Sequence, residues 1–149
     1  MNKHIFNTVR TLSICAVLGV SSLSAQANRK IVVSVPFDFT VVDKHFTAGT
    51  YTLASETLQS PILIRSAQGG NGSFVLALPA QANKVQENAK LVFHQYGNQY
   101  FLSKIWYPGT DQGRELRASK LEQQVARNIS KPEETALIVT GPKQRQRIR

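Results

Sequence analysis

The chain has 149 residues and a formal net charge of +9, and 42% of its residues are hydrophobic. This length suits one domain with a single hydrophobic core. Cys15 is the only cysteine, which excludes an intramolecular disulfide framework, so the stability of the fold must come from packing.

The N-terminal segment has the pattern of a secretory signal peptide. Lys3 and Arg10 make its start basic, and residues 11–24 form an uncharged, largely apolar run. Small residues follow this run, which predicts cleavage between Ala27 and Asn28 and export to the periplasm or the outside. The run is shorter than the roughly 20 residues that a membrane-spanning helix needs, and we expect no transmembrane segment in the mature chain.

The positive charge is concentrated at the C-terminus. The cations of the last segment are Lys143, Arg145, Arg147 and Arg149. A basic block of this kind attracts anionic polymers or lipid surfaces, and it also occurs as a purely solvated tail. Nucleic acid is the least available partner for an exported protein, and we expect no specific nucleic-acid binding.

Three parts follow from these observations. Residues 1–27 are predicted to be a cleaved signal peptide, residues 28–142 a single β domain, and residues 143–149 a disordered basic tail.

The first part of the domain alternates between apolar and polar residues. Its apolar positions are Val33, Val35, Phe37, Phe39 and Val41. This period of two predicts a half-buried strand with those side chains on one face. Because Pro36 has no backbone N–H, we expect the strand at a sheet edge or bulged at that residue.

Shorter apolar runs bounded by turn residues predict further strands at residues 50–55, 61–66 and 73–78. The polar residues 79–89 are expected to lack regular structure or to form a brief helix. A loop is expected at residues 107–113, and a final strand at residues 135–141.

The period changes near the C-terminus. Ser119 and Glu122 have the spacing of a capping box, in which each side chain binds the other residue's backbone N–H. A narrow apolar stripe at helical spacing is formed by Ala118, Leu121, Val125 and Ile129. We therefore predict an all-β fold, a small sandwich or barrel of about 7–8 short strands, with one C-terminal helix near residues 119–129.

Residues 90–106 form the densest apolar and aromatic stretch, and Gly97-Asn98 predicts a two-residue hairpin turn. That turn sets His94 opposite Phe101 and Phe93 opposite Leu102. The face expected to enter the main core holds Leu91, Phe93, Tyr100, Leu102 and Trp106. The second face, expected beneath the helix, holds Val92, His94, Phe101, Ser103, Ile105 and Tyr107.

His94 and Ser103 are diagonal neighbours in this register, but no carboxylate is placed near them. A serine nucleophile needs a base that a third group orients, so we predict no catalytic residue. The only other histidine of the mature chain is His45, which leaves too few ligands for a metal site. No cofactor-binding motif is present.

Four segments carry a resemblance: "VSVPFDF", "TAGTYTL", "LVFHQYGNQYFLSKIW" and "GREL". Together they resemble a set of small secreted bacterial all-β proteins of unassigned function, over most of residues 31–120. The resemblance implies a secreted, noncatalytic β protein and assigns no active-site residue. Where such proteins often have Pro-Ala-Gly, this chain has Thr47-Ala48-Gly49.

Three functions remain open. The first is an envelope-associated or extracellular interaction module that uses its basic tail on an anionic polymer or lipid surface. The second is a small barrel that carries an apolar ligand, lipocalin-like by analogy, with candidate binding residues Phe93, His94, Tyr100, Leu102 and Trp106. The third is a hydrolase that uses His94 and an unplaced acid. The sequence does not define an oligomeric state.

Overall fold

The computed structural model describes residues 29–70, 72–129 and 132–139, and it is mostly β. The elements of these residues are β1 (Arg29–Val35), β2 (Phe39–Val41), β3 (Lys44–Phe46), β4 (Gly49–Ser55), β5 (Ile62–Ser66), β6 (Ser73–Val75), β7 (Leu78–Gln86), β8 (Ala89–Tyr96), β9 (Gln99–Trp106), β10 (Thr110–Glu115), α1 (Lys120–Asn128) and β11 (Glu133–Val139). The predicted fold class is confirmed, with more strands than expected.

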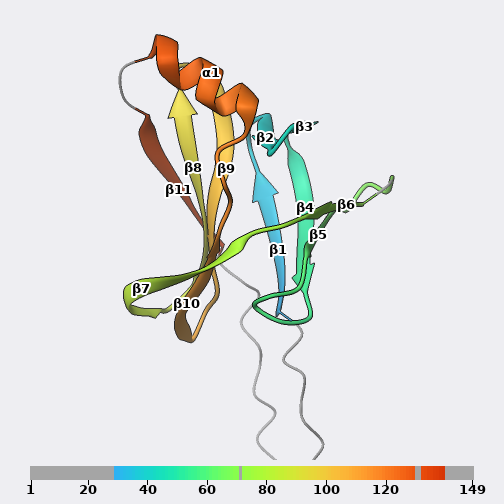
Figure 1. Ribbon diagram of the computed structural model, residues 1–149. Helices are drawn as coiled ribbons and strands as arrows, with labels where there is room; N and C mark the ends of the chain where they lie inside the picture. Colours follow the sequence, from blue (N-terminus) through green and yellow to red (C-terminus); the bar gives the residue numbers. More distant parts are fainter. Residues whose placement is uncertain (1–28, 71, 130–131, 140–149) are drawn as a thin grey trace, which may run out of the picture.

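The strands form two sheets that pack on a common core (Figure 1). Sheet A has four strands in the order β1-β4-β5-β6. Sheet B has seven, in the order β11-β8-β9-β10-β7, and the hairpin of β2 and β3 joins it where β2 runs parallel to β9. The sheets do not close into a barrel, so the two-layer alternative is the one observed.

The first predicted strand is divided between the two sheets. The chain leaves β1 after Val35 and enters β2 at Phe39, so Pro36 lies at the break. β1 is an edge strand of sheet A, as expected, but it ends before Pro36, so the proline lies outside both strands. Val33, Phe39 and Val41 are all buried in the core. The alternation of apolar and polar residues therefore continues across the break.

The central hairpin of β8 and β9 has the predicted register. His94 pairs with Phe101 and Phe93 pairs with Leu102. Gly97 adopts a φ of 60° in the turn, a conformation that favours glycine and that two-residue hairpin loops require.

A β-bulge inverts the faces in the second half of this hairpin. The register shifts and leaves Ser103 without a partner on β8. Ile105, opposite Leu91, consequently lies in the core with no exposed surface. The expected position of Trp106 on the core face is therefore wrong, as is that of Ile105 and Tyr107 on the second face, because one extra residue reverses the alternation.

Trp106 packs instead on the glycine beside it in sheet B. It pairs with Gly113 of β10. A Cβ added to Gly113 would touch the Trp106 ring and lie 2.7 Å from the carbonyl oxygen of Ile105. The indole occupies the space that any larger residue at position 113 would need.

Residues 79–89 were expected to lack strand structure, and this expectation is wrong. β7 covers most of them and pairs with β10, which in turn includes part of the expected loop. Both faces of β7 are largely exposed, so backbone pairing rather than burial defines this strand. A polar sequence without alternating apolar residues has no hydrophobic periodicity from which β7 could be predicted.

The helix α1 crosses one end of sheet B near β8 and β9 (Figure 1). The Ser119 hydroxyl accepts a hydrogen bond from the Glu122 N–H at 3.1 Å, which confirms Ser119 as the N-cap but not the reciprocal half of the capping box, because the Glu122 carboxylate lies against His94. The expected apolar stripe is wrong in part, because Leu121 and Ile129 are 44% and 38% exposed. The side chain that α1 buries is Glu122.

A buried arginine connects the two sheets. Arg114 of β10 has no exposed surface. Its Nη1 donates to the carbonyl oxygens of Thr57 and Ser60, at 3.3 and 3.0 Å, in the loop between β4 and β5. Its Nη2 donates to the carbonyl oxygen of Ala77, between β6 and β7, at 2.6 Å.

No carboxylate in the described part of the chain forms an ion pair with Arg114. Burial lowers the pKa of its guanidinium, and the nearby charge of Arg29 lowers it further, against an opposing effect of Tyr107. Three carbonyl dipoles therefore take the place of a counter-ion.

We predict that Arg114→Met lowers the free energy of unfolding by about 3–5 kcal/mol, because three carbonyl groups lose their donor inside the protein. Urea unfolding followed by tryptophan fluorescence measures this change. Arg65→Met, at an exposed position of β5, is the matched control and should change stability by less than about 0.5 kcal/mol. Equal stability of both variants would contradict the role given to Arg114.

Candidate functional site

A polar cluster surrounds the histidine that the sequence singled out. His94 Nδ1 lies 2.7 Å from Glu122 Oε1, and His94 Nε2 lies 3.1 Å from Ser103 Oγ. Glu134 Oε1 lies 4.0 Å from His94 Nε2 and 3.6 Å from Lys104 Nζ. The sequence assigned Glu122 to the capping box and placed no carboxylate near His94. That expectation is wrong, because α1 brings the Glu122 carboxylate to His94 on another element.

The order serine, histidine, glutamate is the order of a nucleophilic relay. Such a relay also needs substrate access and donors for an oxyanion. Ser103 is only 4% exposed, and none of the three hollows described here includes it in its lining. The arrangement fits a structural role. The buried Glu122 of α1 binds His94 of β8 and so holds the helix against sheet B.

Tyr96 belongs to the same cluster. Burial raises the pKa of the Tyr96 hydroxyl, and the nearby charge of Glu122 raises it further. The phenol is therefore held in its neutral form, which can donate to the Glu122 carboxylate.

We predict that Glu122→Ala lowers the free energy of unfolding by about 1–3 kcal/mol, because His94 loses its partner on α1. Amide hydrogen exchange should accelerate more in α1 than in β8. Gln124→Ala, at an exposed position of the same helix, should change neither quantity much. Covalent labelling of Ser103 by a fluorophosphonate would contradict the structural role given to this cluster.

A pH dependence follows from Tyr96. Its pKa is higher in the folded than in the unfolded protein, so the folded state holds its proton more tightly. This contribution to stability is complete below about pH 10 and is lost as the pH rises further. Unfolding by urea between about pH 9 and 11 should show a decrease in stability that is smaller in Tyr96→Phe. An equal decrease in both proteins would contradict it.

The space between the sheets holds no ligand-sized cavity around the candidate residues. Phe93 and Leu102 lie in the filled core, where the remaining hollow is about 10 Å³, roughly enough for a single water. Tyr100 stacks on Phe37 at 4.0 Å between ring centroids. Because Trp106 faces Gly113, the candidates Phe93, His94, Tyr100, Leu102 and Trp106 are not brought together around one space.

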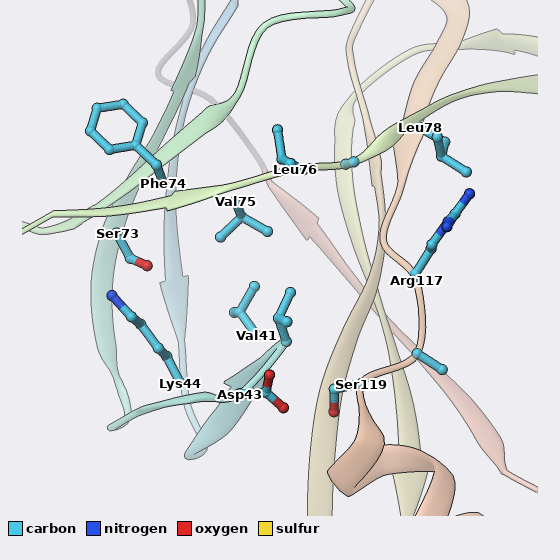
Figure 2. Close-up of a pocket in the computed structure, with 13 residues that line it drawn as sticks. Val41, Asp43, Lys44, Ser73, Phe74, Val75, Leu76, Leu78, Arg117 and Ser119 are labelled. Carbon is cyan, nitrogen blue, oxygen red and sulfur yellow. The ribbon is translucent and has the colours of Figure 1, made fainter.

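An open apolar cleft lies elsewhere, at one side of the two-sheet core (Figure 2). Its volume is about 730 Å³. Its walls are the turn between β2 and β3, the strand β6 with the segment leading into β7, and the residues before α1. The lining residues are Val41, Val42, Asp43, Lys44, Ser73, Phe74, Val75, Leu76, Ala77, Leu78, Arg117, Ala118 and Ser119.

Large apolar side chains are exposed along this cleft. Leu76 is 76% exposed, Leu78 is 49% exposed and Val42 is 39% exposed. Val41 and Val75 approach each other from opposite walls (Figure 2). Contiguous exposed apolar surface of this kind marks interaction or ligand sites in folded proteins.

The backbone is strained at one wall of the cleft. Val42 has a φ of 57°, in the left-handed region that β-branched residues rarely adopt. A residue with this conformation costs about 1–2 kcal/mol relative to ordinary backbone. Strained backbone of this type concentrates at binding and catalytic sites.

The sequence signal for the cleft was present but was interpreted as a strand. Residues 74–78 are five consecutive apolar residues, and an alternating strand cannot turn all of them inward. In the structure β6 ends at Val75 and β7 begins at Leu78. Leu76 and Ala77 therefore cross between the sheets, and Leu76 is left outside the core.

No family model, curated protein or solved structure matches this chain. Within the described residues, no group of His, Asp and Glu side chains is arranged to hold a metal ion. No helix among those residues has the length and apolar character to cross a membrane. The signal-peptide prediction and the basic residues Lys143, Arg145, Arg147 and Arg149 lie outside the described residues.

Proposed function

We propose that the protein is an exported, noncatalytic binding domain that takes an apolar group in the cleft between the turn of β2 and β3 and the segment from β6 to β7. The observation that carries the proposal is the cleft itself. Its volume of about 730 Å³ lies in the range of small-molecule sites, and its lining is mainly apolar with a few polar groups, as such sites usually are.

The strained turn supports the same site. Val42 keeps an unfavourable backbone conformation at the cleft, where its side chain adds apolar surface. The sequence analysis considered carriage of an apolar ligand inside a barrel. The proposal moves that function from the filled core to the open side of the two sheets.

A direct test uses the uncharged dye Nile red, whose fluorescence rises in an apolar environment. Leu76→Asp should weaken its binding at least about tenfold, because the dye loses the contact with one large apolar side chain. Val32→Asp is the matched control: Val32 is 52% exposed on β1 and does not line the cleft. Equal affinity in both variants would reject this cleft as the site.

We predict opposite changes in stability and binding for Val42→Gly. Glycine accepts the φ of 57° without strain, so the free energy of unfolding should rise by about 1 kcal/mol. Nile red affinity should fall, since the apolar side chain is gone. Urea unfolding and dye titration of the same preparation measure the two changes. A loss of both stability and affinity would show that the turn is not strained.

The basic tail supports a second binding role, because its four cations are concentrated in one segment. Removing residues 143–149 should abolish retention on an anionic polymer such as heparin–agarose at low salt. The shortened protein should still bind Nile red. Retention that survives the deletion would assign the polymer binding to the β domain.

A further inference from the structure

The cleft carries charge as well as apolar surface. Lys44 and Arg117 both line it, and both are exposed. Figure 2 shows Lys44 on the side of Ser73 and Arg117 on the side of Leu78, with Val41 and Val75 in the region between them.

These cations are available to a ligand. Among the described residues, no ion pair includes Lys44 or Arg117. Asp43 is the one carboxylate in the lining, so cations outnumber acids within the cleft. An anionic group that enters is attracted, and a cationic group is repelled.

One end of the cleft also offers a hydroxyl. In Figure 2 the Lys44 side chain extends toward Ser73 from the opposite wall. No hydrogen bond of the Ser73 hydroxyl is found within the described residues, and Ser73 is a lining residue. An ammonium group and a hydroxyl on facing walls can donate together to the oxygens of one anionic head group.

We infer that the ligand is a single-chain amphiphile with an anionic head group, which binds as a monomer. Its acyl chain lies on Leu76 and Val42, and its head group pairs with Lys44 beside Ser73. This inference rests on the proposed function and names its ligand class. Because the chain is buried by apolar contact, each pair of methylenes removed should weaken binding about tenfold.

The test compares three ligands with the same twelve-carbon chain, each below its micelle concentration and at low salt. They are dodecanoate, the net-uncharged dimethyldodecylamine oxide and dodecyltrimethylammonium. Displacement of Nile red from the purified full-length protein gives each affinity. We expect dodecanoate to bind at least about tenfold more tightly than the cationic ligand, with the uncharged one between them, and this difference to shrink with salt.

Two variants separate the local effect from the net charge. Lys44→Ser should weaken dodecanoate about fivefold and leave the uncharged ligand unchanged. Lys30→Ser, at an exposed position of β1 outside the cleft, removes the same charge and should change neither affinity. An equal loss in both variants would overturn the assignment of the head group to Lys44.

The remaining outcomes divide the two proposals. Equal affinity for the three ligands would keep the cleft as an apolar site and reject the anionic head group. Failure of all three ligands and of Nile red to bind would reject the proposed function itself. Sedimentation with phosphatidylglycerol vesicles without binding of monomeric dodecanoate would reject the monomeric ligand in favour of a membrane surface.

Discussion

The contact between Arg114 and three backbone carbonyls is the constraint on which the two-sheet arrangement depends. Its guanidinium lies on sheet B, and its acceptors are in the loop between β4 and β5 and in the link between β6 and β7. A planar fork with fixed donor directions fixes the positions of these segments, which a flexible ammonium would not do. Because no described carboxylate pairs with it, the arginine positions backbone and does not serve a buried ion pair.

The sequence predicted what short-range chemistry determines. Pro36 indicated an edge, Gly97 indicated the turn and hence the register, and Ser119 indicated the start of α1. It did not predict the bulge at Ser103, which reversed the faces for Trp106, because no residue type is specific for a bulge. β7 was also missed, since its pairing with β10 is a property of the backbone and leaves no apolar pattern in the sequence.

The polar cluster and the cleft could also be predicted only in part from the sequence. Glu122 satisfies the spacing of a capping box, yet its carboxylate binds His94 on another element, a contact that only the tertiary structure creates. The consecutive apolar residues from Phe74 to Leu78 did contain a signal for exposed surface. The sequence could not place Lys44 beside these apolar residues, because β3 and β6 are distant in the chain. Only the turn at Val42 brings β3 to the cleft.

The anchoring of Ala77 gives the cleft a thermodynamic character of its own. Its carbonyl is held by Arg114, and Leu76 lies next to it in the chain. Because the Ala77 carbonyl is held in place, the segment between β6 and β7 loses little conformational freedom when a ligand occupies the cleft. A site whose backbone is already ordered binds without the unfavourable entropy of folding a loop around its ligand, so occupancy can change without a rearrangement of either sheet.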